Sequence, residues 1–202
     1  MIKAIIFDMD GVLIDATEWH YEALNRALDL FSYSIGREDH LKVYNGLPTA
    51  EKLKMMSEKQ GLPWSLHEII KSLKRKYTEE ITNQQCRPSH PKQLLLTGLK
   101  KRYQLACGSN AQKYSVLNML KMAHIDHFFD QIVGNDEGYK PKPSPEIYQA
   151  IFHKLGIQPI EAFIVEDAPH GVAAAIASGA NVIEVRGYND VDLSLFEKFD
   201  LL

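Results

Sequence analysis

The chain begins Met1-Ile-Lys-Ala-Ile-Ile-Phe-Asp8-Met-Asp10-Gly-Val-Leu-Ile-Asp15, and this stretch decides the expected fold. Residues 4–7 form a short apolar run without a polar break, which predicts a strand buried on both faces. Side chains two residues apart on extended backbone point to the same side, so Asp8 and Asp10 would stand together at the carboxyl end of this strand. Two such carboxylates need a cation or a proton nearby, although Asp and Gly are also ordinary turn residues.

The length and composition limit the class of protein. A chain of 202 residues can form one domain with an insertion or two small domains, and 45% hydrophobic with 24% charged residues is ordinary for a globular protein. The net charge of −3 predicts no nucleic-acid partner, and the pattern of apolar residues leads us to expect neither a membrane span nor a secretory signal. Cys86 and Cys107 are not spaced for a metal. We therefore expect a cytoplasmic monomer with reduced thiols and no membrane partner.

The region that follows the first strand has a helical pattern only. Apolar residues recur at spacings of three and four, and no strand-like run interrupts them. Residues 83–92, with Pro88 and Pro91, have the composition of a return linker. The helices are expected over residues 16–33, around 41–44, from Thr49 to Gly61 and over 65–82. We predict a helical unit over residues 16–82, inserted into a domain formed by residues 1–15 and 83–202.

The second part of the chain alternates short apolar runs with helical segments. This alternation predicts an α/β fold, a Rossmann-like parallel sheet with right-handed crossovers. The expected strands lie within residues 103–108, 131–135, 162–165 and 182–185. The expected helices lie around 93–101, over 111–123, from Ser144 to Gly156 and over 171–178, with Ser144 as the N-cap of the third.

Polar residues stand where these strands end. In a parallel sheet the carboxyl ends of the strands meet at one edge, so we expect these groups to converge there. Carboxylates suit Mg²⁺, whereas hydroxyl, lysine and backbone N–H groups suit a phosphate, and the combination predicts phosphoryl transfer. One Asp can attack phosphorus while a second moves the protons. The converging residues would be Asp8, Asp10, Ser109, Asn110, Lys140 or Lys142, Glu166 and Asp167.

The same residues resemble the four motifs of the haloacid dehalogenase superfamily, in that family's order. The motifs are Asp8-Met-Asp10-Gly-Val-Leu-Ile-Asp15, Ser109-Asn110, Lys142-Pro-Ser-Pro145 and Glu166-Asp167-Ala-Pro-His-Gly171. The resemblance covers nearly the whole chain. The helical insertion resembles the small cap of the subgroup that contains β-phosphoglucomutase and many sugar-phosphate phosphatases.

The resemblance implies a role for each motif residue. Asp8 would be the nucleophile and Asp10 the general acid and base. Ser109 and Lys142 would hold the phosphate, with Asn110 beside them. The Asp8 carboxylate, the Asp10 carbonyl and Asp167 would bind Mg²⁺, with Glu166 as a further ligand or as an orienting group. Two alternatives stay open, because Lys140 could replace Lys142 and Ser109 could serve only as a helix cap.

Substrate selection would depend on the cap. His20 matches a histidine of β-phosphoglucomutase-like members, although it could equally be a surface residue of its helix. Residues 45–49 resemble the substrate-specificity loop of that cap. The arginine that usually precedes this loop in the mutase is missing, and Lys42 or Lys52 is the available replacement. This departure argues against mutase activity.

We therefore predict a Mg²⁺-dependent phosphatase that hydrolyses a small phosphorylated metabolite, a sugar phosphate, through an aspartyl-phosphate intermediate. The enzymatic alternative is a hexose phosphomutase of the β-phosphoglucomutase type. A phospho-receiver signalling domain would also gather an acidic cluster, a hydroxyl and a lysine, but the helical insertion and Asp10 argue against it. A non-enzymatic binding module would not need the complete set of motifs.

Overall fold

The computed structural model describes residues 1–44 and 47–202, which form two compact units. The core unit comprises Met1–Asp15 and Arg87–Leu202, and the helical unit comprises Ala16–Cys86. The return to the core unit lies four residues beyond the expected boundary after residue 82. The reason is that α4 (His67–Gln85) continues past that point, since no Gly or Pro stops it before Pro88.

The core unit is built on a five-stranded parallel sheet in the order β3-β2-β1-β4-β5. Its strands are β1 (Ala4–Phe7), β2 (Gln104–Gly108), β3 (Gln131–Val133), β4 (Ala162–Glu166) and β5 (Asn181–Glu184). The first strand is central, with Ile6 opposite Ala106 on one side and Ile164 on the other. The predicted α/β fold class, with a parallel sheet, is confirmed.

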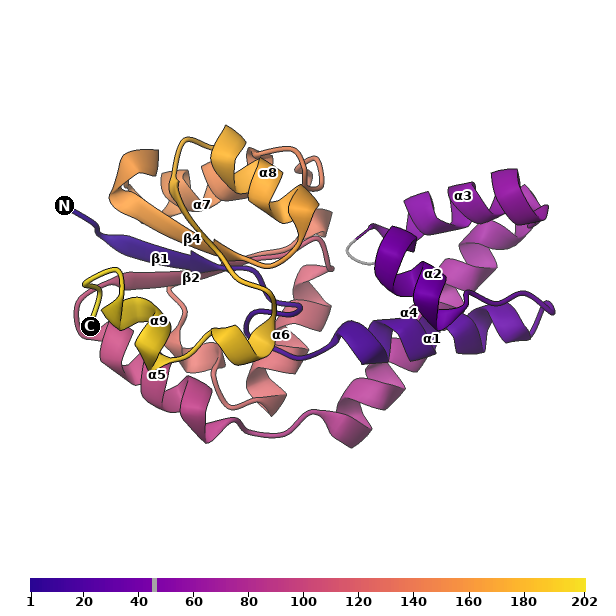
Figure 1. Cartoon of the computed structure of the whole chain (residues 1–202), viewed down its shortest axis with the longest axis horizontal. Helices are drawn as coiled ribbons and strands as arrows, with labels where there is room; N and C mark the ends of the chain where they lie inside the picture. The colour runs from indigo at the N-terminus through magenta and orange to yellow at the C-terminus, as the bar shows by residue number, and fades with distance from the viewer. Residues whose placement is uncertain (45–46) are drawn as a thin grey trace. The chain divides into compact units, whose positions relative to one another are not determined.

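Helices cover both faces of this sheet (Figure 1). They are α5 (His90–Lys100), α6 (Lys113–Met122), α7 (Glu146–Leu155), α8 (Pro169–Ala177) and α9 (Leu193–Glu197), with 3₁₀ turns at Asp126–Phe128, Asn135–Glu137, Pro159–Glu161 and Tyr188–Asp190. On the α7 and α8 face, Ile6 packs in one cluster with Tyr148 and Ile151. On the opposite face, the Phe7 ring contacts Phe196, with centroids 6.0 Å apart. Because β1 is buried on both sides, the first polar side chains after Lys3 come where the strand ends.

Several helix boundaries differ from expectation for local reasons. α5 begins three residues early because Pro91 suits the first turn of a helix. α6 begins two residues late because Ala111 still belongs to the loop after β2 and donates its N–H to Ser109 Oγ. α7 begins at Glu146, whose N–H reaches Ser144 Oγ at 3.4 Å, so the expected cap residue acts just outside the helix.

The helical unit has no strand within residues 16–44 and 47–86. It contains α1 (Thr17–Asp29), α2 (Arg37–Asp39), the π-helical turn η1 (His40–Tyr44), α3 (Thr49–Gln60), the 3₁₀ turn η2 (Trp64–Leu66) and α4. α1 and α4 pack side by side (Figure 1), and their apolar stripes meet around Leu24, Leu28 and Ile70. The short helix expected around residues 41–44 is a π turn, and Asn45 and Gly46 of the expected specificity loop lie outside the described residues.

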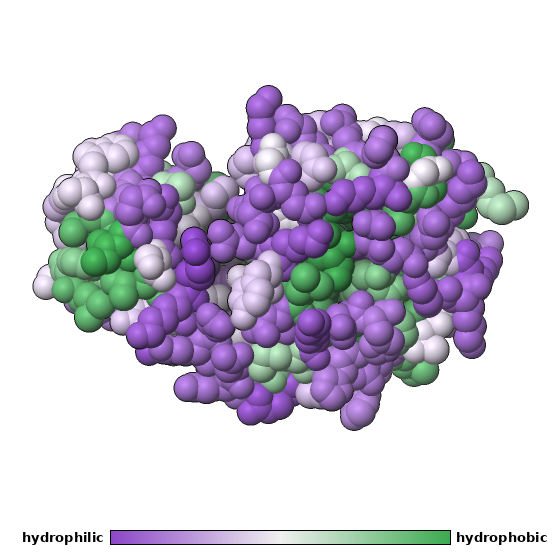
Figure 2. Space-filling view, turned by 180° about the vertical axis from the view of Figure 1, so that it is seen from behind, coloured by the Kyte–Doolittle hydropathy of each residue, from purple (hydrophilic) through white to green (hydrophobic). Residues whose placement is uncertain are grey.

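Polar residues cover most of the face shown in Figure 2, and apolar residues gather there in separate patches. Throughout the described ranges, no helix combines the length and the apolar character that crossing a membrane requires.

Candidate active site

The chain turns sharply after β1, and its two aspartates lie at this turn. Asp8 follows the last residue of the strand, and the N–H of Gly11 then bonds to the carbonyl of Ile14 at 2.7 Å. Gly11 has φ of +82°, and a Cβ at this position would lie only 2.1 Å from Asp167 Oδ2. Glycine therefore provides both the left-handed backbone and the space that lets this turn pass against Asp167.

Lys142 joins the first strand to the fourth. Its Nζ donates to Asp8 Oδ1 at 2.6 Å, to Glu166 Oε1 at 2.6 Å and to the Gly108 carbonyl at 2.9 Å. The side chain is only 2% exposed, so the three donors of the ammonium group are all used inside the protein. The backbone of Lys142 is fixed as well, since its N–H donates to Asn110 Oδ1 at 2.8 Å. A buried cation thus connects the proposed nucleophile with the acidic end of β4.

The other lysine of this segment lies elsewhere. The Lys140 side chain is 80% exposed and pairs with Glu146, its Nζ lying 3.2 Å from Oε1. Of the two lysines that the sequence left open, the structure places Lys142 beside Asp8 and Lys140 at the surface.

Ser109 and Asn110 follow β2 and are positioned by local hydrogen bonds. Ser109 is 1% exposed, and its Oγ accepts the N–H of Ala111 at 3.0 Å. The Asn110 amide makes two hydrogen bonds to the backbone of Lys142. Its Oδ1 accepts the Lys142 N–H, and its Nδ2 donates to the Lys142 carbonyl at 3.4 Å. The Asn110 side chain therefore orients the lysine, a role that the sequence did not indicate.

Three carboxylates form a compact group at this edge of the sheet. Asp8, Glu166 and Asp167 each offer an oxygen, and these oxygens all lie within 4.8 Å of one another. Asp167 Oδ1 is buried and has no hydrogen-bond partner among the described residues. The Asp10 carboxylate is not a member of this group. Hard oxygen donors around an unsatisfied buried oxygen fit a Mg²⁺ ion.

The protonation of the group follows from burial and from charge. Burial raises the pKa of Asp8 well above its usual range, and Lys142 opposes that rise. Burial, together with Glu166 and Asp10, raises the pKa of Asp167 to about 6. For Lys142, burial lowers the pKa, but Asp8 and Glu166 outweigh burial and hold it well above the usual value. The lysine stays charged, and the carboxylates are the groups whose charge needs compensation.

Sequence comparison agrees with this geometry. The chain matches the family described as haloacid dehalogenase-like hydrolase over residues 5–185, which is most of its length. The chain belongs to the haloacid dehalogenase-like hydrolases. The predicted superfamily and the predicted hydrolase class are thereby confirmed.

Two phosphatases and one β-phosphoglucomutase are similar to this hydrolase. The phosphorylated carbohydrates phosphatase of Thermotoga maritima is 27% identical over 178 residues, covering 88% of this chain and 82% of the relative. The fructose-1-phosphate phosphatase YqaB of Escherichia coli is 26% identical over 184 residues, covering 90% and 95%. The crystal structure of β-phosphoglucomutase from Clostridium difficile superposes with a TM-score of 0.83 over 100% of both chains at 20% identity, which shows a shared fold.

Two residues of this hydrolase lie against Glu166 and were given no role from the sequence, although Gly171 belongs to the fourth motif. The Tyr148 hydroxyl donates to Glu166 Oε1, and the Tyr148 ring lies beneath Lys142 Nζ, 4.9 Å from the ring centroid. Gly171 lies in the first turn of α8, and a Cβ at this position would lie 2.2 Å from the Glu166 carboxylate. Tyr148 follows the apolar face of α7, so its sequence position indicates only a core residue.

The substrate residues predicted for the cap lie in the helical unit. His20 Nδ1 is 3.1 Å from Lys74 Nζ, and Lys52 is 7% exposed in the first turn of α3. Lys42, the other candidate for the missing arginine, is 70% exposed and pairs with Glu38 at 2.5 Å. Their roles toward a substrate stay predictions.

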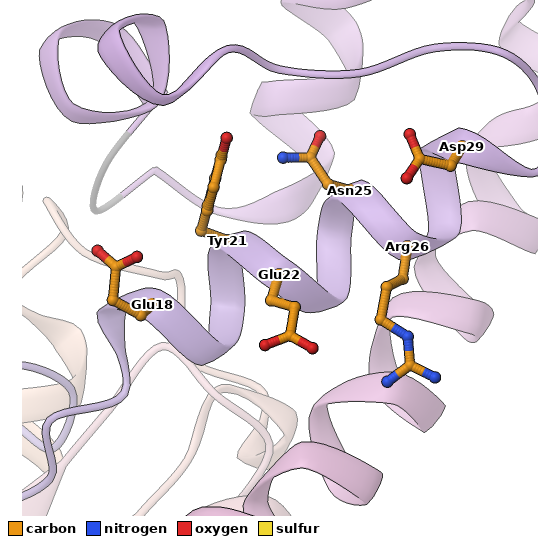
Figure 3. Close-up of a pocket in the computed structure, with 6 residues that line it drawn as sticks. All are labelled: Glu18, Tyr21, Glu22, Asn25, Arg26 and Asp29. Atoms are coloured by element: carbon orange, nitrogen blue, oxygen red, sulfur yellow. The ribbon is translucent and has the colours of Figure 1, made fainter.

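The helical unit also contains a hollow of about 460 Å³ along one face of α1 (Figure 3). Its polar side chains largely hold the unit together, because Tyr21 and Asn25 both donate to the Ile35 carbonyl at 3.1 Å and Arg26 pairs with Glu80. The hollow is lined by Glu18, Tyr21, Glu22, Asn25, Arg26 and Asp29. We assign it no catalytic role.

Proposed function

We propose that this hydrolase is a Mg²⁺-dependent phosphatase of small phosphorylated metabolites, with a sugar phosphate as its expected substrate. The observation that carries the proposal is the buried Lys142 ammonium, shared between Asp8 and Glu166 beside Asp167. Two relatives named for phosphatases of phosphorylated sugars, covered along most of their length, support the substrate class.

The proposed reaction has two displacements at phosphorus. An Asp8 oxygen attacks, the Asp8 oxygen–phosphorus bond forms and the ester oxygen–phosphorus bond breaks, while Asp10 gives its proton to the departing alcohol. Water then attacks the aspartyl phosphate: the water oxygen–phosphorus bond forms, the Asp8 oxygen–phosphorus bond breaks and Asp10 takes the water proton. Inorganic phosphate leaves and free Asp8 is restored. Lys142 offsets the negative charge of Asp8 and of the entering phosphate, which would otherwise repel each other. Ser109 and Asn110 lie at the adjacent strand end, where they can contact phosphate oxygens.

The residues that would hold Mg²⁺ are the Asp8 and Asp167 carboxylates and the Asp10 carbonyl, with Glu166 in support. When bound, the ion supplies positive charge that lets a phosphate dianion approach a carboxylate.

The test is phosphate release from an aryl phosphate in the presence of Mg²⁺. We expect Asp8→Asn to lower kcat by roughly 10³-fold or more, because the nucleophile is lost, and Asp10→Asn to lower it by about 10²–10⁴-fold. Asp200→Asn is the matched control, since Asp200 is an exposed aspartate outside the four motifs. Equal turnover in wild type and Asp8→Asn would remove Asp8 from its role.

A second measurement separates the phosphatase from the mutase. Phosphorylated sugars, nucleotides and phosphoglycolate are offered individually, and free phosphate is measured together with the sugar-phosphate isomers. Stoichiometric phosphate release supports the proposal. Isomer conversion that depends on a bisphosphate primer, without net release, would establish the phosphomutase instead.

A further inference from the structure

Tyr148 contacts both members of the Lys142–Glu166 pair through different parts of its side chain. It is fully buried on α7, its hydroxyl donates to Glu166 Oε1, and the same oxygen accepts Lys142 Nζ at 2.6 Å. The aromatic ring lies under the ammonium group, with Nζ 4.9 Å from the centroid. The side chain thus supplies a donor to the anion and a π face to the cation.

Glu166 is confined from a second direction. The backbone of α8 passes so close at Gly171 that a Cβ there would overlap the carboxylate at 2.2 Å. Between Gly171 and the Tyr148 hydroxyl, the Glu166 carboxylate has little room to rotate. A hydrogen bond from a phenol to a carboxylate is strong in a dry site, and the ring adds attraction for the ammonium group.

We propose that Tyr148 is a positioning residue for the phosphoryl-transfer centre. Its hydroxyl satisfies part of the Glu166 charge, so that the Lys142 ammonium is shared between Glu166 and Asp8 and is not drawn wholly to Glu166. Without the hydroxyl, Glu166 attracts the Lys142 ammonium group more strongly. Asp8 then loses part of its contact with this positive charge, which keeps the Asp8 carboxylate ionised for attack. The kinetic part of this inference rests on the proposed function, whereas the effect on Lys142 does not.

Tyr148→Phe tests the proposal because it keeps the ring and removes only the hydroxyl. We expect kcat on an aryl phosphate to fall about tenfold with KM within about twofold of wild type, as for other residues that orient a metal-site ligand. Calorimetric titration with Mg²⁺ alone is expected to show a dissociation constant about threefold higher or more. Tyr139→Phe is the matched control, since Tyr139 is partly buried against the same core.

A spectroscopic readout keeps the test independent of catalysis. In protein labelled with ¹⁵N-lysine, the Lys142 ammonium resonance is identified by its loss in Lys142→Arg. We expect Tyr148→Phe to shift this resonance and Tyr139→Phe to leave it in place. An unshifted resonance overturns the proposal, as does an unchanged kcat in a variant whose only defect is a lower melting temperature. A wild type without phosphatase activity but with the shifted resonance would refute the proposed function and retain the positioning role.

Discussion

The core unit buries two lysines with very different partners. Lys142 and Lys92 are 2% and 3% exposed, so depth does not distinguish them. Lys142 Nζ contacts the carboxylates of Asp8 and Glu166. Lys92 Nζ instead donates to two backbone carbonyls, that of Tyr188 at 2.7 Å and that of Val191 at 2.5 Å, and lies 4.1 Å from the centroid of the Tyr188 ring.

The partners set the charge of each lysine. Burial lowers the pKa of Lys92 to about 8, and Asp192 offsets only part of that effect. For Lys142 the carboxylates outweigh burial and raise the pKa. A buried lysine held by carbonyls therefore acts as a clamp for backbone, here the segment from Tyr188 to Val191. Lys142, between two carboxylates, instead belongs to the proposed catalytic site, where it offsets the negative charge of Asp8 and Glu166.

The largest contrast is expected in catalysis when each lysine is replaced by methionine. Lys142→Met should lower kcat by about 10²–10³-fold, because the charge that offsets Asp8 and the phosphate is lost. Phosphate release with Mg²⁺ measures the effect, and a melting curve establishes that the variant is folded. Lys142→Arg, which keeps the charge, serves if the methionine variant is unstable. Activity within threefold of wild type in folded Lys142→Met would show that Lys142 is not part of the reaction, whereas Lys142→Arg should retain more activity than Lys142→Met because the charge is kept.

The sequence could reveal Lys142 but not Lys92, and the reason is the kind of partner. Lys142 belongs to a motif, and its carboxylate partners end predicted strands, so the parallel topology brings them together. The partners of Lys92 are main-chain carbonyls 96 and 99 residues away, and every residue type has such a group. Tyr148 was missed similarly, because an apolar helix face does not indicate where a hydroxyl points.

The fold followed from the alternation of apolar runs and helices because strands buried on both faces leave a plain signal. Helix ends were less predictable. The extension of α4 to Gln85 and the early start of α5 depend on residues that are compatible with either a helix or a linker. The order of the strands within the sheet also depends on crossovers that the local sequence does not encode.

The next effect concerns stability at Lys92. We expect Lys92→Met to lower the free energy of unfolding by about 1–3 kcal/mol at pH 7, because two buried carbonyls lose their donor. Activity should stay within about threefold of wild type, since Lys92 touches none of the residues at the carboxylate cluster. Urea unfolding monitored by circular dichroism measures the first quantity, with exposed Lys101→Met as control. A large loss of activity without loss of stability would give Lys92 a part in the reaction. The distinction between a structural Lys92 and a catalytic Lys142 would then fail.

The same variant sharpens the comparison through pH. The folded-state pKa of Lys92, about 8, lies below its unfolded value of 10.5, so the unfolded chain binds more protons between these values. Stability from this group therefore rises with pH in that window, by about 2 kcal/mol between pH 7 and pH 9.5. Lys92→Met lacks this contribution, so the substitution should become more destabilising as pH rises. Parallel stability curves for the two proteins would contradict the assigned pKa.

A buried base in the helical unit provides the third case, with neither carboxylate nor carbonyl partner. His40 is 2% exposed, its ring centroid lies 4.6 Å from that of Tyr21, and neither ring nitrogen has a hydrogen-bond partner among the described residues. Burial, with a smaller contribution from Lys52, lowers its pKa from 6.5 to about 4. The unfolded state therefore binds more protons once pH falls below 6.5, and stability declines from there toward pH 4.

We expect wild type to lose roughly 1 kcal/mol from this group between pH 7 and about pH 5.8, and His40→Phe, which keeps the aromatic contact, to lose none of it. Both tryptophans of the chain, Trp19 and Trp64, lie in the helical unit, so their fluorescence during urea unfolding monitors that unit. Circular dichroism followed in parallel monitors both units. An acid decline of the same size in His40→Phe would mean that another group of the helical unit titrates. Loss of the decline in His40→Phe would show that His40, a buried base without a hydrogen-bond partner among the described residues, is neutral in the folded protein. This is the opposite of Lys142, whose two carboxylate partners raise its pKa.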